Sequence, residues 1–159
     1  NGALTVFATD LTAEIVVASK TSTANPSPIG GTFALSVYGV LAADDTAWIA
    51  NVEHDGFFRT NVGVFVPAAP EPGQPFVFDI VVYDAEGLEV GSSSMVFEEA
   101  GMMQQSLDDF GLADDLLDGW VEITCSEPEV PWYGYATVID EATGDAVYRP
   151  AVTRQSSLQ

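Results

Sequence analysis

The sequence contains few of the residues that carry covalent or transition-metal chemistry. Its 159 residues include one cysteine, Cys125, and one histidine, His54. A single cysteine forms no intrachain disulfide, and zinc sites take several His or Cys ligands. The GxSxG and HExxH motifs of hydrolases and metalloproteases do not occur. We therefore expect a protein that is not an enzyme, with Cys125 as a small buried hydrophobic residue.

Basic residues are also scarce. Four of them oppose 24 acidic residues, which gives a formal net charge of −20 at pH 7. Such a charge repels nucleic acid, so no nucleic-acid partner is expected. Three explanations of the acidity stay open: the solvated surface of an acidic secreted protein, adaptation to high salt, and calcium binding through carboxylate oxygens.

Long apolar runs are missing as well. No stretch of about 20 apolar residues occurs, so we expect no membrane span. The start, NGALTVFATD, lacks the basic and continuous apolar regions of a signal peptide, and we interpret it as compatible with the product of signal cleavage. Apolar residues nevertheless make up 47% of the sequence, which predicts a folded domain with a core.

What the sequence does have is alternation. Apolar and polar residues alternate with a period of two along most of the chain, which is typical of β-strands. Turn sequences rich in Gly, Pro, Asn and Asp separate the strands. Many short strands with regular turns predict a β-sandwich. The predicted strands are 3–8, 13–20, 32–40, 46–52, 57–66, 75–83, 88–97, 119–125, 132–139 and 145–152.

The segment 101–119, GMMQQSLDDFGLADDLLDG, breaks the alternation. Its apolar residues recur at roughly helical spacing, which predicts a short helix near 103–110 and a second turn at 113–117. Its aspartates include Asp108 and Asp109, which are candidate calcium ligands. Because the segment lacks the spacing of an EF-hand, we favour a solvated acidic face over a buried stripe of Leu and Phe.

The two ends of the chain share a pattern. Residues 1–40 align with 118–152 across three predicted strands, with Ala18 over Ala136. We interpret this similarity as an internal repeat of a domain-sized module. The predicted organisation is the C-terminal strands of an incomplete first β-sandwich repeat (1–42), a complete β-sandwich module (46–154) and a tail (155–159).

Three segments carry a resemblance: FFRTNVGVFVP (57–67), VVYDAEGLEVGS (81–92) and YGYATVIDEATGDAVYRPA (133–151). They are similar to segments of the tandem immunoglobulin-like β-sandwich modules of large secreted and cell-surface bacterial proteins. The similarity rests on turn and strand residues. The segment SKTSTANPSPIGGTF (19–33) is similar to another closing hairpin of these modules, but it has Lys20 and Phe33 where such modules usually have Arg and Tyr.

The resemblance implies a fold and a role. The fold is all-β, an antiparallel immunoglobulin-like β-sandwich with one short helix and a three-strand partial repeat at the N-terminus. The role is a non-catalytic structural or assembly module of an extracellular, cell-surface or periplasmic complex, acting through strand edges and sandwich faces. Because three strands alone bury too little surface to be stable, we expect residues 1–40 to contact a protein partner from the same precursor or a neighbouring subunit.

Aromatic residues indicate an alternative function, adhesion or carbohydrate binding. The candidate binding residues are Trp132, Tyr133 and Tyr135. Alternation along a strand puts the two tyrosines on one face and Trp132 on the other. This favours one core aromatic and a rim of tyrosines over a continuous platform for a sugar.

Arg59 is a further candidate binding residue. An arginine on a strand of an acidic chain needs a carboxylate partner, and Asp140 and Asp145 are the expected ones. We favour an ion pair that fixes a turn over ligand binding. In the sequence DEATGD, these two aspartates can stabilise a turn through side-chain hydrogen bonds, and the same oxygens are candidate calcium ligands.

If the acidity is an adaptation to ionic strength, the melting temperature should rise markedly between low and molar NaCl, because salt screens the self-repulsion. Millimolar calcium, added at constant ionic strength, tests the calcium interpretation in the same series of melting scans. An unchanged melting temperature in NaCl contradicts salt adaptation. No shift with calcium leaves the four candidate aspartates as solvated acids.

Overall fold

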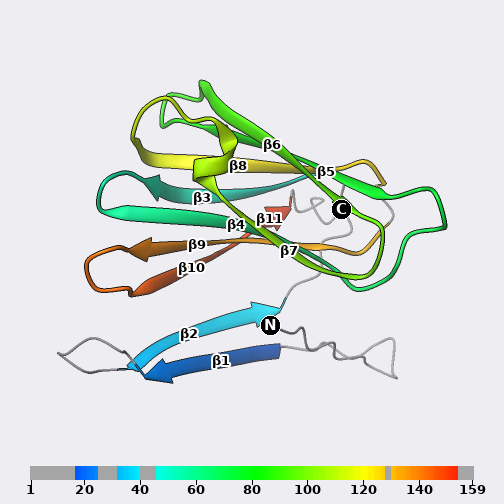
Figure 1. Cartoon of the computed structure of the whole chain (residues 1–159), viewed down its shortest axis with the longest axis horizontal. Helices are drawn as coiled ribbons and strands as arrows, with labels where there is room; N and C mark the ends of the chain where they lie inside the picture. Colours follow the sequence, from blue (N-terminus) through cyan, green and yellow to red (C-terminus); the bar gives the residue numbers. More distant parts are fainter. Residues whose placement is uncertain (1–16, 25–31, 40–45, 128–129, 154–159) are drawn as a thin grey trace, which may run out of the picture.

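The structure is a computed structural model. It describes residues 17–24, 32–39, 46–127 and 130–153, with side chains from residue 46 onward. Antiparallel strands make up nearly all of its regular structure (Figure 1). The predicted strand 3–8 lies outside the described residues.

Two antiparallel sheets pack face to face as a β-sandwich (Figure 1), which confirms the predicted fold class. Alternation builds both sheets, because each strand turns one apolar face toward the opposite sheet. The four-stranded sheet has the order β10 (Ala146–Pro150), β9 (Tyr133–Asp140), β4 (Phe58–Val66) and β7 (Gly101–Ser106). The five-stranded sheet has the order β11 (Val152–Thr153), β3 (Thr46–His54), β8 (Leu116–Cys125), β5 (Phe76–Tyr83) and β6 (Glu89–Phe97).

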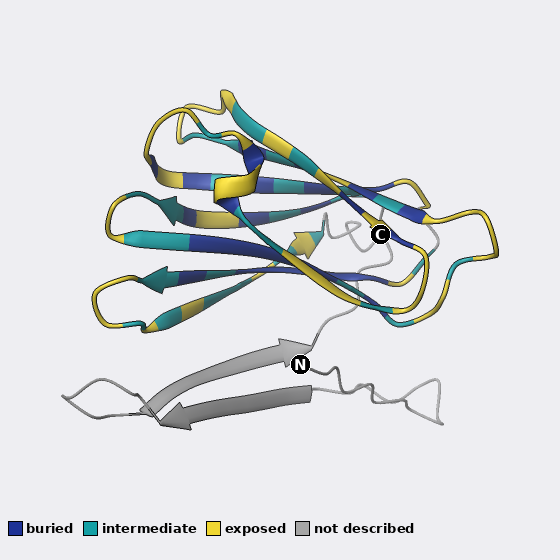
Figure 2. Ribbon diagram, in the orientation of Figure 1, coloured by how far each residue is buried: buried dark blue, intermediate teal, exposed yellow. Residues whose placement is uncertain are grey.

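The core lies between the two sheets (Figure 2). Trp132 and Phe78 are fully buried, and their ring centroids are 5.3 Å apart in an edge-on contact. Phe78 also meets Phe97 edge-on at 5.4 Å. Burying each such side chain contributes about 1.5–3 kcal/mol, so this aromatic group is a principal support of the fold.

The segment 101–119 differs from the predicted helix. Residues Gly101–Ser106 form β7, and only Leu107–Phe110 is helical, as a single 3-10 turn. The cause is strand pairing: β7 is hydrogen-bonded along β4, and this ladder outweighs the local helical spacing. The expected apolar stripe is present in part, because Leu107 and Phe110 are buried. The second predicted turn, at 113–117, was wrong: the segment has no helical residues, and β8 begins at Leu116.

The outer face of the four-stranded sheet carries a layer of tyrosines. Because Trp132 and Ala136 face the core, alternation turns Tyr133 and Tyr135 outward. The ring of Tyr135 lies over Gly63 of β4, so close that a Cβ at residue 63 would overlap the ring. Glycine therefore allows this ring to lie across the neighbouring strand.

A separate two-stranded sheet precedes the sandwich. It consists of β1 (Val17–Ala24) and β2 (Thr32–Gly39), paired antiparallel. β2 lies alongside β10 (Figure 1), but no hydrogen-bonded ladder joins them. Among the described strands, β2 and β10 therefore each have one paired edge and one unpaired edge.

We expect Gly63→Ala to lower the free energy of unfolding by about 1–3 kcal/mol, because the new methyl group displaces the ring of Tyr135. Urea unfolding measures the change. Gly56→Ala is the control, since nothing lies within 4 Å of a Cβ at that position. Equal stabilities for the two variants would contradict the close approach of Tyr135 to β4.

Candidate functional site

The predicted aromatic residues divide between the core and the surface. Trp132 has no exposed surface and packs on Phe78 inside the sandwich, so it is unable to stack on a sugar. Tyr133 and Tyr135 lie on the outer face, where each is only 9% exposed. The three residues thus do not form a common surface.

Stacking with Tyr148 of β10 explains the low exposure of the two tyrosines. The centroid of Tyr135 is 6.2 Å from that of Tyr133 and 5.6 Å from that of Tyr148, with nearly parallel rings. The Tyr135 hydroxyl donates to Gln104 Oε1 at 3.1 Å. Burial raises the pKa of both Tyr133 and Tyr135. Within the tyrosine layer (Tyr133, Tyr135 and Tyr148), Tyr133 and Tyr135 therefore offer little free ring surface.

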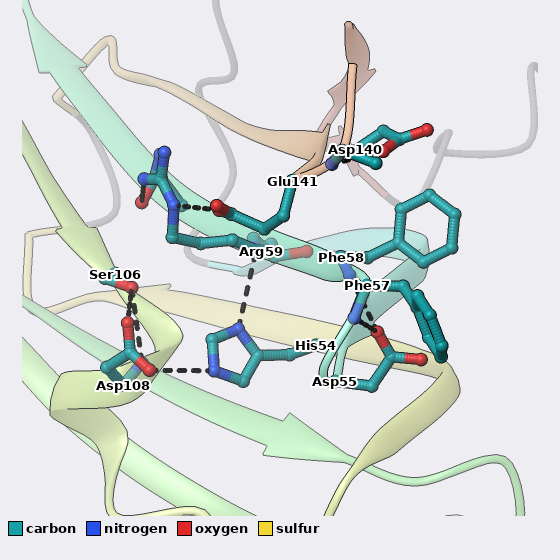
Figure 3. Close-up of polar contacts among 12 residues, drawn as sticks. His54, Asp55, Phe57, Phe58, Arg59, Ser106, Asp108, Asp140 and Glu141 are labelled. Atoms are coloured by element: carbon teal, nitrogen blue, oxygen red, sulfur yellow. Dashed lines mark hydrogen bonds and ion pairs between the residues drawn. The ribbon is translucent and has the colours of Figure 1, made fainter. Parts of the chain in front are cut away.

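Arg59 forms an ion pair, but not with the expected aspartates. Its Nε donates to Glu141 Oε1 at 2.7 Å, and its Nη1 donates to Asn61 Oδ1 at 3.2 Å (Figure 3). The prediction that Asp140 or Asp145 would be its partner was wrong, because the turn after β9 brings Glu141 to β4 instead: the Glu141 N–H donates to the Phe57 carbonyl at 2.8 Å. Since both charged side chains are roughly half exposed, the pair contributes about 0–1 kcal/mol.

Asp140 stabilises the turn between β9 and β10. Its Oδ1 accepts from the N–H groups of Ala142 at 2.8 Å and Thr143 at 3.1 Å. The Asp145 N–H donates to Thr143 Oγ1 at 3.2 Å. These are the hydrogen bonds of a side-chain-stabilised turn. Among the described residues, no group of three or more His, Cys, Asp or Glu side chains is placed to hold a metal ion, and Asp108 and Asp109 lie on the 3-10 turn, away from Asp140.

A hydrogen-bonded cluster links the end of β3 to the connection after β7 (Figure 3). Asp108 Oδ1 lies 3.0 Å from His54 Nε2, and Asp108 Oδ2 accepts from Ser106 Oγ at 2.6 Å. The Thr60 N–H donates to His54 Nδ1 at 3.4 Å, so the hydrogen of the neutral ring lies on Nε2, which donates to Asp108. Ser106 is placed by its role as the cap of the 3-10 turn, where Oγ also accepts the Asp108 N–H.

The cluster has the residue types of a serine hydrolase triad in an order that does not support catalysis. In a triad, histidine lies between serine and aspartate and takes the proton of the serine. Here Asp108 lies between Ser106 and His54, and the second nitrogen of His54 faces a main-chain N–H. No histidine nitrogen reaches the serine hydroxyl, so the cluster joins two segments of the fold and activates no nucleophile.

The electrostatics of the cluster centre on Asp108. The hydrogen bond from Ser106 lowers the pKa of Asp108, and the charges of His54 and Arg59 act in the same direction.

The neighbouring hollow, of about 380 Å³, is lined by His54, Asp55, Gly56, Asp108, Leu112, Ala113, Asp114 and Asp115. The sequence gives His54 no partner, because nothing local signals a pairing with an aspartate 54 positions away.

A second aromatic surface lies on the outer face of the five-stranded sheet. Ile49, Val121 and Val82 are in the core, so alternation turns their neighbours Trp48, Trp120 and Tyr83 outward. The rings of Tyr83 and Trp120 stack with centroids 4.0 Å apart and 9° between their planes. Trp48 Nε1 donates to Glu122 Oε2 at 2.8 Å. This surface was not predicted from the sequence. Its only signal there is one aromatic residue at an outward-facing position in each of three separate strands.

Comparison of the chain with protein-family models, with curated proteins and with solved structures finds no significant match. In the part of the chain that the structure describes, no helix has the length and apolarity needed to cross a membrane.

Cys125 is buried at the end of β8, and burial raises the pKa of its thiol, as for a structural cysteine.

We expect the stability difference between the native protein and Asp108→Asn to depend on pH. Because the folded pKa of Asp108 lies below its usual 3.8, the carboxylate stabilises the fold above about pH 4, and this contribution is lost as the pH falls through the folded pKa. Urea unfolding between pH 7 and pH 3 measures it. Asp109→Asn is the control, since it removes an equal charge from a side chain that has no hydrogen bond among the described residues. Parallel pH curves for the native protein and Asp108→Asn would contradict the role of Asp108.

Proposed function

We propose that this chain is a non-catalytic assembly module of an extracellular, cell-surface or periplasmic complex, and that it binds a protein partner through the edge of β10 and through residues 1–42. The observation that carries the proposal is the pair of unpaired edges, β2 and β10, that lie side by side. An exposed strand edge presents unpaired N–H and C=O groups and is a template for strand addition.

Two buried polar atoms on β10 support this proposal. Tyr148 Oη and Arg149 Nε are buried and have no hydrogen-bond partner among the residues that the structure describes. An unsatisfied buried donor costs about 1–3 kcal/mol, and native proteins rarely leave such groups unpaired. Both residues lie on β10, whose second edge is unpaired among the described strands.

The cluster around His54 supports the non-catalytic part of the proposal. The aspartate, and not the histidine, accepts from the serine hydroxyl, and the nearby Arg59 is paired with Glu141. The alternative of a carbohydrate site on Trp132, Tyr133 and Tyr135 has less support, since Trp132 is in the core and the tyrosines cover one another.

The test separates the N-terminal segment from the sandwich. All members of the core cluster lie between Ala47 and Ala136, so a chain of residues 46–159 keeps its own core. We expect that chain to melt cooperatively and to bind residues 1–42, fused to a soluble carrier, in isothermal titration calorimetry. We also expect the full chain to associate with rising concentration in light scattering. The proposal fails if 1–42 does not bind and the full chain stays monomeric at all concentrations.

Two hydroxyl deletions form a matched control for this test. Tyr148→Phe removes a buried hydroxyl without a partner, so it should not lower the stability of the full chain but should weaken association. Tyr135→Phe removes a hydroxyl that donates to Gln104, so it should cost about 1 kcal/mol of stability and leave association unchanged. The reverse pattern would exclude β10 as the binding edge.

A further inference from the structure

The outer face of the five-stranded sheet has a regular arrangement of aromatic and acidic side chains. Cross-strand neighbours form two adjacent rows on this face, one of Trp48, Glu122, Val81 and Ser92, the other of Ala50, Trp120, Tyr83 and Glu89. We call Trp48, Tyr83, Trp120, Glu89 and Glu122 the acidic aromatic strip. Its three aromatic residues are half-buried, so each has exposed surface, unlike the buried Tyr133 and Tyr135.

The rings of the strip are held in place before any ligand arrives. The hydrogen bond from Trp48 to Glu122 fixes the indole edge, and the parallel stack fixes Tyr83 against Trp120. All three rings rise from paired strands of one sheet, so their spacing is set by the ladder. A rigid aromatic surface loses little conformational entropy on binding, which favours recognition.

The charge of the strip has one sign. Glu89, Glu122 and the nearby Asp79 are carboxylates, which only accept hydrogen bonds when ionised. The basic side chains that the structure describes, Arg59 and Arg149, lie on the four-stranded sheet instead. Burial raises the pKa of Tyr83, and the charges of Glu122 and Glu89 raise it further. A ligand that matches this face is therefore a cation with several donors.

We propose that the acidic aromatic strip binds an arginine-containing basic segment of a partner protein. A guanidinium group is planar, stacks on the face of Trp or Tyr, and donates two parallel hydrogen bonds to a carboxylate. The strip offers aromatic rings and a carboxylate at neighbouring positions: Trp120 lies beside Tyr83, and Glu122 lies beside Trp48. The net charge of −20 attracts such a segment over long range. This surface lies on the other sheet from the β10 edge and does not depend on the assembly proposal.

The experiment titrates the full chain with a capped peptide that carries three arginines spaced by glycines, at low and moderate salt, by calorimetry. A peptide with neutral citrulline in place of arginine is the matched ligand control. We expect Trp120→Ala and Glu122→Gln each to weaken binding of the arginine peptide by about three- to tenfold. The citrulline peptide should bind at least about tenfold more weakly, because it keeps the shape of arginine without its charge.

Variant controls separate this site from general attraction to an acidic protein. Glu122→Gln keeps an acceptor for Trp48 and removes only the charge. Asp109→Asn removes the same charge from the 3-10 turn and should leave binding unchanged. If Trp120→Ala does not fold, Trp48→Ala replaces it. Equal weakening by Asp109→Asn and Glu122→Gln, or equal binding of the two peptides, overturns the proposal. The proposal is also overturned if the chain binds neutral oligosaccharides but not the arginine peptide, and if Trp120→Ala abolishes that binding.

Discussion

The architecture depends on the packing of Trp132 between the two sheets. With Trp132 fully buried against Phe78, the phase of β9 is fixed, and Tyr133 and Tyr135 face outward. A slip of one residue would turn their hydroxyl groups into an apolar core, where unpaired polar groups are costly. The tyrosine layer and the requirement for glycine at position 63 both follow from this phase.

Features with a local cause were accessible from the sequence. Alternation placed most strands within one to three residues, as in β5, which was predicted at 75–83 and runs Phe76–Tyr83. Turn chemistry was equally readable. Asp84 Oδ1 accepts from the N–H groups of Glu86 and Leu88, and Gly87 has a φ of 84°, as the DAEG sequence leads one to expect.

Features that need the register of distant strands were not accessible. The choice between helix and strand at β7 was decided by β4, which lies far away in the sequence. The partner of Arg59 was decided by the path of the turn after β9, which brings Glu141 close and not Asp140. Likewise, the three rings of the acidic aromatic strip come from three strands, and only their pairing places them together. Periodicity gives the face of each residue but not its neighbours.

The position of β4 has a consequence for local stability. Both of its edges are hydrogen-bonded, to β9 and β7, and residues Thr60–Val64 are all buried, although they alternate between the core and the outer face. Between Asn61 and Val64, where β4 is buried and paired on both sides, water therefore reaches the amides only after the core or the tyrosine layer is lost. Hydrogen exchange in β4 reports the unfolding of the whole sandwich, whereas exchange in the edge strand β10 reports local fraying.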